Sequence, residues 1–345
     1  MRCGLRVLVY EFITGGGWYS QGNELPPASL IDEGLAMVRA LASDFAAIEG
    51  TSVDVLRDVR FRTFELPGTV HRVSNLADER RALARLSALA DWTVLIAPEF
   101  NERLLTRTRA IERAGRRLLG PSSQAVALAT DKQATAVHLK RHGLPVPPGV
   151  ALAAGEPMPQ VFDYPAVLKP RDGAGSQGLR YIPRAGQGVA PWPARLEQYC
   201  PGQPASVAVL CGPDLAVPLA PCRQRLAGDK EFAYLGGSLP LDAIAARRAQ
   251  RLATRAVQSL PGVRGWLGVD LVMGDDPAGS GDRIFEINPR LTTSYVGLRA
   301  LSQVNLAAAM VAVAQGEPVE LCWKESEVSF TSRGEISIAA VPGGE

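Results

Sequence analysis

The first hundred residues alternate between short apolar runs and longer amphipathic stretches, and this alternation constrains the fold more than any other feature. The runs are β-branched and predict buried strands, and the stretches carry apolar residues at helical spacing. Strands separated by helices pair in parallel, so we expect an α/β domain with helices on both faces of a parallel sheet, ending near Gly120-Pro121. The predicted strands are 5–10, 53–56 and 93–97, and the predicted helices are 29–41 and 78–89.

Beyond residue 121 the pattern changes to strands joined by glycine- and proline-rich turns. Residues 131–142 predict a helix that ends at Gly143, with a proline-rich connector after it. The runs 166–169 and 179–182 predict two strands around a glycine-rich turn, a small unit that is able to move. Further strands are predicted at 206–210, 268–273 and 283–287, a long helix at 241–259, and a strand-like tail from residue 321.

The charge balance and the cysteines limit the classes of function. The chain has 37 Lys and Arg against 35 Asp and Glu and no basic block, so a nucleic-acid partner is not expected. Its five cysteines are scattered without a Cys-x-x-Cys pair, which is typical of reduced thiols in a cytoplasmic protein. No apolar run is long enough to span a bilayer, and Glu11 interrupts the N-terminal run, so we expect a soluble protein without a membrane partner.

Two apolar strands near the C-terminus carry the most informative polar residues. A loop of turn-forming residues separates 268–273 from 283–288, which predicts an antiparallel hairpin. Because side chains alternate between the faces of a strand, Glu286 and Asn288 share one face, and in the right register Asp270 joins them. Two carboxylates and an amide oxygen are the hard ligands that Mg²⁺ prefers, so this face is a candidate metal site.

A simpler interpretation of the same alternation is a half-exposed hairpin whose polar face meets solvent. In either case Phe285 and Ile287 are expected to point to the other face and pack in the core. The run 289–294, Pro-Arg-Leu-Thr-Thr-Ser, favours the functional interpretation, because an arginine and several hydroxyls directly after the carboxylates supply donors for anionic oxygens.

At this point the chain resembles the ATP-grasp superfamily of carboxylate–amine ligases over about residues 120–315. The resemblance implies an α/β chain, α+β in its ATP-grasp part, with a Rossmann-like domain at 1–121, a small lid at 122–195 and a large subdomain at 196–345. The carrying elements occur in the superfamily's order and are Asp131-Lys132, Val167-Leu168-Lys169-Pro170, the glycine loop Asp172–Gly178, Asp270, and Glu286-Ile287-Asn288-Pro289-Arg290.

The resemblance also implies roles toward ATP and Mg²⁺, with Mn²⁺ as an alternative metal. The glycine loop closes over the β- and γ-phosphates, and residues 197–199 form the hinge that reads the adenine edge. Arg290 and Arg225 are the catalytic candidates on the acyl-phosphate side. The implied ATP-binding residues are Lys132, Lys169, Asp172, Gly173, Gly175, Ser176, Gly178, Glu197, Gln198, Tyr199 and Lys230, and the implied metal ligands are Asp270, Glu286 and Asn288.

Two positions depart from the superfamily's pattern. Many relatives place an acidic residue after the hinge to bind the ribose, but residues 201–206 contain none, so ribose contact must come from elsewhere. Relatives of the D-alanine ligase type carry an arginine two residues before the metal-binding aspartate, where this chain has Gly268. The second departure argues against a D-alanine–D-alanine ligase.

Within the superfamily, segments 10–17 and 288–299 resemble the tyramine–glutamate ligase group, which works in methanofuran assembly and has counterparts in methylofuran-type C1-carrier biosynthesis. This resemblance implies two-step amide formation: a carboxylate, L-glutamate, attacks the γ-phosphorus of ATP, and an amine, tyramine or a related aromatic amine, then displaces phosphate. Arg223, Arg225 and Arg290 are candidate partners for the carboxylates of glutamate. Relatives often form homodimers, so a homodimer is an expectation here.

The triplet Gly15-Gly16-Gly17 follows the first strand but matches neither the dinucleotide-binding nor the P-loop spacing. We therefore expect this turn to bind the second substrate at the carboxyl edge of the sheet. Alternatives that remain open are another amino-acid or peptide ligase of the superfamily and a non-catalytic nucleotide sensor. The predicted substrate-binding residues are Glu11, which would hold the ammonium group, Thr14, Gly15, Gly16, Arg223, and Tyr234, which would lie near the aromatic ring.

Overall fold

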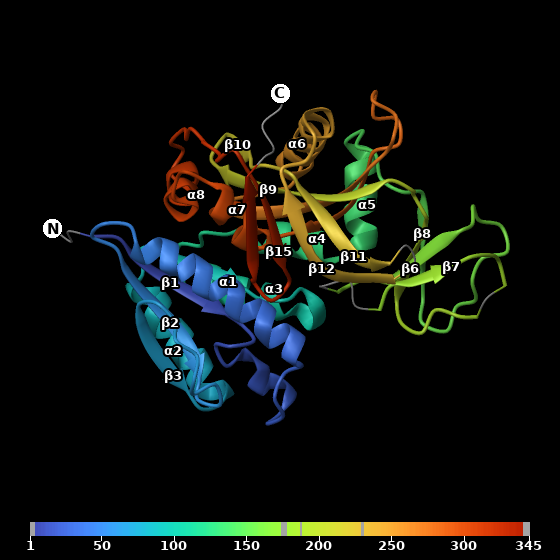
Figure 1. Ribbon diagram of the computed structural model, residues 1–345. Coiled ribbons are helices and arrows are strands. Elements are labelled where there is room, and N and C mark those ends of the chain that lie inside the picture. The colour runs from blue at the N-terminus through green and yellow to red at the C-terminus, as the bar shows by residue number, and fades with distance from the viewer. Residues whose placement is uncertain (1–3, 174–177, 187, 229–230, 341–345) are drawn as a thin grey trace.

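The computed structural model describes residues 4–173, 178–186, 188–228 and 231–340. Its named strands form three sheets, which are a parallel sheet near the N-terminus, a small antiparallel sheet and a large antiparallel sheet. Figure 1 shows the N-terminal sheet and the small sheet on opposite sides of the large one. The predicted α/β class, with an N-terminal parallel sheet, is confirmed.

The N-terminal sheet has the strand order β3-β2-β1-β4, and all its pairings are parallel. The edge strand β3 and the helix α3 were not predicted, because their apolar residues are sparse. The strands are β1 (Arg6–Glu11), β2 (Ser52–Asp58), β3 (Thr69–Val73) and β4 (Trp92–Ile96), and the helices are α1 (Ala28–Ala46), α2 (Leu76–Leu89) and α3 (Arg103–Arg113), with short 3₁₀ turns at η1 (Gly17–Gln21) and η2 (Phe100–Glu102).

Helices cover both faces of this sheet, as the alternation along β1 requires. Val7 and Val9 belong to the same core as Leu41 and Phe45 of α1, and all four are nearly inaccessible to solvent. Their neighbours Leu8 and Tyr10 face the other way and join a second core with residues of α2 and α3. The helix α1 therefore lies alone on the face that also meets the rest of the molecule (Figure 1).

The small sheet has the strand order β5-β8-β6-β7 and an apolar core of its own, which includes Leu152, Leu168 and Leu196. The helices α4 and α5 that precede it contribute Ala125 and Leu139 to the core beneath the large sheet instead. The domain limits 1–121, 122–195 and 196–345 stay predictions. The elements are α4 (Ser123–Thr130), α5 (Lys132–Arg141), β5 (Gly149–Leu152), β6 (Ala166–Pro170), β7 (Arg180–Ile182) and β8 (Ala194–Gln198).

The large sheet has the strand order β14-β13-β9-β11-β12-β15-β16, with β10 paired to β9. The predicted strands of this region lie in the sheet, and the predicted long helix corresponds to α6. The strands β10, β11 and β12 and the helices α7 and α8 were not predicted. The elements are β9 (Gln203–Gly212), β10 (Leu215–Pro218), β11 (Cys222–Gly228), β12 (Glu231–Leu239), α6 (Ala243–Gln258), β13 (Gly265–Met273), β14 (Arg283–Asn288), α7 (Ser294–Leu301), α8 (Leu306–Ala314), β15 (Ser326–Thr331) and β16 (Ile336–Ala340).

Two expectations from composition can be compared with the described part of the chain. None of its helices combines the length and the apolar character that crossing a membrane requires. The four cysteines that it includes are free thiols, and Cys3 lies outside the described residues.

Candidate active site

A cavity of about 490 Å³ lies between the small sheet and the large sheet and reaches the N-terminal domain at α1. It brings together ten of the residues that the sequence predicted for the site, although these come from segments more than 150 positions apart. The ten are Lys132, Lys169, Glu197, Tyr199, Arg225, Tyr234, Asp270, Glu286, Asn288 and Arg290.

The predicted hairpin at the floor of this cavity is formed by β13 and β14. In their antiparallel register Asp270 lies opposite Glu286, and Gly268 lies opposite Asn288. The three candidate metal ligands therefore converge on one face, as strand alternation predicted. The solvent-facing interpretation of this hairpin does not hold, because the face closes a cavity rather than meeting bulk water.

One expectation for this hairpin is wrong. Ile287 packs in the core as predicted, but Phe285 lines the cavity and is only partly buried. The register shifts after Asp270, so that Leu271 pairs with Ile284 and Phe285 is an extra residue on β14. Such a β-bulge re-aims a side chain and breaks the simple alternation of faces.

Asp270 is held by two amide donors. Gln224 Nε2 donates to its Oδ1 at 2.8 Å, and Asn288 Nδ2 donates to its Oδ2 at 2.9 Å. Burial, and after it the charge of Glu286, raises the pKa of Asp270 to about 7. The two facing carboxylates thus lack enough positive charge between them, which a bound cation would supply.

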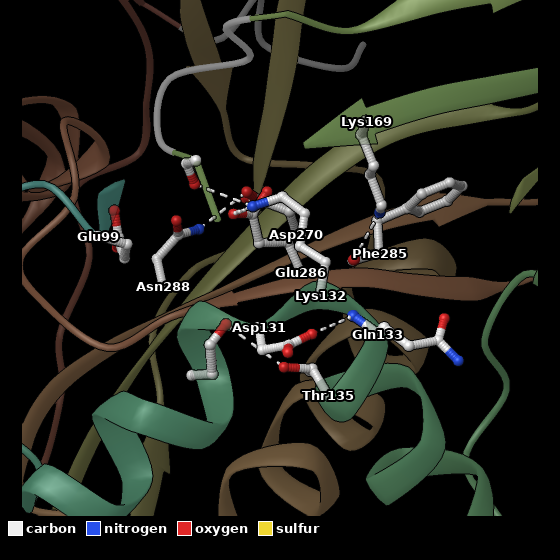
Figure 2. A network of polar contacts seen from close by, with 12 residues as sticks. Glu99, Asp131, Lys132, Gln133, Thr135, Lys169, Asp270, Phe285, Glu286 and Asn288 are labelled. Atoms are coloured by element: carbon white, nitrogen blue, oxygen red, sulfur yellow. Dashed lines mark hydrogen bonds and ion pairs between the residues drawn. The ribbon is translucent and has the colours of Figure 1, made fainter. Parts of the chain in front are cut away.

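Lys132, the first residue of α5, partly compensates Glu286. Its Nζ lies 2.6 Å from Glu286 Oε1 and donates to the carbonyl oxygen of Gly173 at 2.9 Å (Figure 2). Burial opposes the charge of this lysine, but Glu286, Glu99 and Glu197 outweigh it and raise the pKa of Lys132 above its usual value. The side chain therefore joins the acidic pair to the beginning of the glycine loop.

A second buried lysine lies at the small-sheet end of the cavity. Lys169 Nζ is 2.6 Å from Glu197 Oε1 and donates to the carbonyl oxygen of Phe285 at 3.1 Å. Arg195 Nε binds the other oxygen of Glu197 at 3.0 Å. Burial lowers the pKa of Lys169 despite this pairing. The Glu197 carboxylate is therefore paired with two cations, one at each oxygen.

Arg290 follows the strand β14 and contacts the N-terminal domain. Its Nε donates to Glu99 Oε1 at 2.8 Å, and Glu99 stands just beyond the carboxyl end of β4. Burial opposes the guanidinium charge, but Glu99 and Glu33 raise the pKa of Arg290. The guanidinium is therefore charged and held by the Glu99 carboxylate and by the carbonyl oxygen of Leu291, and the side chain lines the cavity.

The donor set fits a divalent cation. The described residues contain no cluster of three or more His, Cys, Asp and Glu side chains arranged for a metal, so the two carboxylates need the amide of Asn288 as third ligand. Oxygen donors of this kind suit Mg²⁺ or Mn²⁺, whereas sites for softer metals use His and Cys.

The structure does not bring some predicted residues to the cavity. Thr14, Gly15 and Gly16 are buried inside the N-terminal domain, where a side chain on Gly16 would meet Val73. Arg223 is exposed. With the Gln203 amide turned so that its oxygen faces the guanidinium, Arg223 Nε donates to that oxygen at 2.8 Å. The substrate-binding roles of these four residues find no support in this geometry.

The glycine loop is described only at its ends. Asp172 Oδ2 accepts from the backbone N–H of Asn101 at 3.2 Å, which links the loop to the N-terminal domain. Gly178 has a φ of +77° and packs against Pro170 and Trp192, so a side chain there would be strained. Gly175, Ser176 and Lys230 lie outside the described residues. Asp172, Gly173, Gly178 and Gln198 flank the cavity without lining it.

Glu11 has a different surrounding from the one predicted. Its carboxylate accepts from the backbone N–H of Ile13 at 2.9 Å, and from the N–H and the hydroxyl of Thr14, both at 2.7 Å. Burial raises its pKa to about 7. The residue therefore closes its own turn and borders a minor cavity of about 40 Å³ rather than lining the large one, which corrects the expectation of a carboxylate open to the amine.

Three residues of the site were missed by sequence reasoning. Glu33 lies in α1, where nothing in the amphipathic pattern distinguishes it. Gln224 lies between the two arginines that were singled out. Glu99 could have been found, since an acidic residue after a strand's carboxyl end, here behind Pro98, is a common place for a ligand contact.

Comparison with known families agrees with this geometry. A model described as an ATP-grasp domain matches residues 129–294, and a model described as a pre ATP-grasp 3 domain matches residues 51–126. The chain belongs to the ATP-grasp superfamily of carboxylate–amine ligases, with a pre-ATP-grasp domain ahead of the ATP-grasp domain.

The chain is similar to a protein named tyramine–L-glutamate ligase from Methanocaldococcus fervens, with 24% identity over 333 residues that cover 94% of this chain and 99% of the relative. Among solved structures, an ATP-grasp superfamily protein from Archaeoglobus fulgidus matches with a TM-score of 0.71 and 22% identity, covering 98% of this chain and 100% of the other. The N5-carboxyaminoimidazole synthetase from Staphylococcus aureus, complexed with ADP, matches with a TM-score of 0.68 and 14% identity, covering 95% and 82%.

Proposed function

We propose that the protein is an ATP-dependent ligase that joins the carboxylate of L-glutamate to tyramine or a related aromatic amine through an acyl phosphate, releasing ADP and phosphate. The observation that carries the proposal is the cavity in which two buried lysines, a converging Asp270/Glu286/Asn288 set and a buried arginine surround one space. The similarity to proteins named tyramine–L-glutamate ligase supports the choice of substrates.

In this proposal ATP binds at the end of the cavity that lies against the small sheet. Lys132 and Lys169 offset the charge of its phosphates, and the backbone at 197–199 contacts the adenine. The glycine loop 172–178 closes over the phosphates, as its connection to Lys132 through the Gly173 carbonyl suggests. Closure keeps water away from an acyl phosphate, which would otherwise hydrolyse.

Asp270, Glu286 and Asn288 are the residues that would hold Mg²⁺, or Mn²⁺ in its place. The bound cation would offset the negative charge on the phosphate oxygens during transfer. Gln224 orients Asp270 for this purpose through the 2.8 Å hydrogen bond to its Oδ1. Phosphoryl transfer depends on positioning and charge rather than on a protein nucleophile, so the site needs no catalytic serine or cysteine.

Arg290, fixed by Glu99, holds the reacting carboxylate and then the acyl-phosphate oxygens. Arg225 lines the same cavity from β11 and contributes a second positive charge. Tyr234, also in the lining, offers an apolar surface for an aromatic ring. From the similarity to proteins named tyramine–L-glutamate ligase we infer that the protein works in the cytoplasm, in the assembly of a methanofuran- or methylofuran-type C1 carrier.

The test is ADP release by the purified protein with ATP, Mg²⁺, L-glutamate and tyramine, with mass detection of the amide. We expect turnover that depends on all four components and falls by about 10³-fold or more in Glu286→Ala, since that change removes a charge at the transferring phosphoryl group. Tyrosine, dopamine and phenethylamine in place of tyramine define the amine. Absence of turnover with ATP still bound would favour a nucleotide sensor instead.

A further inference from the structure

Four carboxylates line the described part of the cavity, and three of them have charged or amide partners. Glu197 is paired with Lys169 and Arg195, Glu286 is paired with Lys132, and Asp270 is held by amides in the candidate metal site. The fourth, Glu33, makes no ion pair with a described residue.

Glu33 reaches the cavity from the N-terminal domain. Its Oε1 accepts a hydrogen bond from the hydroxyl of Thr293 at 2.5 Å, which fixes the carboxylate beside the segment that follows the metal-binding strand. Glu33 and Arg290 both border the large cavity and the minor one, so they lie side by side in the wall between the two. The charge of Glu33 also acts on Tyr234, the aromatic residue of the lining.

This position meets a requirement of amide formation. An alkylamine is protonated at neutral pH, and an ammonium has no lone pair with which to attack an acyl carbon. The site must therefore bind a cation and remove a proton from it next to the acyl phosphate. A carboxylate is suited to both tasks, because its negative charge attracts the ammonium and its oxygen can accept the proton.

We propose that Glu33 binds the ammonium group of the amine substrate and accepts its proton for the attack, an inference that rests on the proposed function. One proton passes from nitrogen to the Glu33 carboxylate. The freed lone pair forms the C–N bond, the C–O bond to phosphate breaks, and its electron pair leaves with phosphate. The second excess proton on nitrogen passes to the departing phosphate, and Glu33 returns its proton to water.

Hydroxylamine separates this step from acyl-phosphate formation, because it is largely uncharged at neutral pH and traps acyl phosphates as hydroxamates. For Glu33→Gln we expect hydroxamate formation and the KM for ATP to stay near wild type, while kcat for amide formation falls about 10²-fold or more and the KM for the amine rises. The amine used in these assays is the one that wild type couples best among tyramine, tyrosine, dopamine and phenethylamine. Glutamine can still accept from Thr293, so the fold is retained.

Asp32→Asn is the matched control, because it removes the same charge from the neighbouring position of α1, where the side chain faces Arg333 rather than the cavity. We expect its amine KM to be unchanged. Unaltered amine kinetics in Glu33→Gln, or an equal loss of hydroxamate and amide, would overturn the inference. Hydroxamate formation by wild type without coupling of any amine would also overturn it, whereas a wild type that forms neither product refutes the proposed function itself.

Discussion

At the scale of single residues, Glu11 is a buried carboxylate that holds a turn together rather than binding a ligand in the large cavity. It ends β1, is 3% exposed, and its two oxygens accept three hydrogen bonds from the turn that follows. Burial nevertheless dominates and raises its pKa from 4.5 to about 7. The folded protein therefore binds a proton at this site more tightly than the unfolded chain does.

This difference predicts a pH dependence of stability. Between pH about 4.5 and about 7 the folded state holds more protons at Glu11, so the free energy of unfolding falls as the pH rises through this window. Each pKa unit is worth about 1.4 kcal/mol, so the contribution amounts to about 3 kcal/mol. In Glu11→Gln this part of the dependence disappears, which urea unfolding at pH 5, 6, 7 and 8 can measure. Parallel curves for variant and wild type would contradict the assignment.

The polar residues of the β13–β14 hairpin could be predicted from the sequence, whereas Glu33 of α1 could not. Alternation along β14 placed Glu286 and Asn288 on one face, and the structure supplies the register that brings Asp270 to them. The same rule failed at Phe285, because a bulge depends on the partner strand and leaves no local signal. Glu33 was not predicted for another reason. Its place in the cavity depends on how α1 packs against the segment at the start of α7, a contact between residues about 260 positions apart.

At the scale of elements, α1 forms the part of the cavity wall that belongs to the N-terminal domain. One face of α1 packs on β1. The helix also supplies Glu33, the residue directly before Gly34, to the cavity. A Cβ at Gly34 would lie 2.7 Å from the Glu11 carboxyl carbon, so this close approach requires glycine. Three strands of the parallel sheet and the helices α1 and α2 were predicted from local pattern, whereas β3, α3, β11 and β12 were not. The pairing of β11 with β12 follows from tertiary contacts rather than from a local signal.

Gly34→Ala tests this close approach. In an open helix the change would stabilise the protein by about 1 kcal/mol. Here the added methyl must displace either a hydrogen-bonded carboxylate or the helix, so we expect a loss of about 1–3 kcal/mol. Thermal unfolding measures it, and Gly120→Ala, with no atom within 4 Å of its added Cβ, is the control expected to be neutral. A gain in stability for Gly34→Ala would contradict the packing described for α1.

At the scale of the whole molecule, the N-terminal domain and the large sheet share one apolar core. Val7 and Phe45 belong to the same buried cluster as Leu210 and Tyr295. Asp44 of α1 adds a polar connection, because its Oδ2 accepts from the Tyr295 hydroxyl at 2.6 Å and its Oδ1 accepts from Arg299 Nη2, also at 2.6 Å. The small sheet, with its separate core, is connected more loosely.

Asp44→Ala should therefore act on stability and on one substrate only. It leaves the fully buried Tyr295 hydroxyl without its acceptor, which costs about 1–3 kcal/mol. Because the core is shared, we expect calorimetry to show the N-terminal domain and the large sheet unfolding together at a lower temperature.

The kinetic consequence follows from the position of Glu33 on the same helix. Loosening α1 moves Glu33 relative to Arg290, while Lys132, Lys169 and the hinge stay in place, so the KM for the amine should rise and the KM for ATP should not. Asp163→Ala, at an exposed position before β6, is the control expected to change neither. A separate early transition of the N-terminal domain, or an equal rise of both KM values, would show that α1 does not couple the two parts in this way.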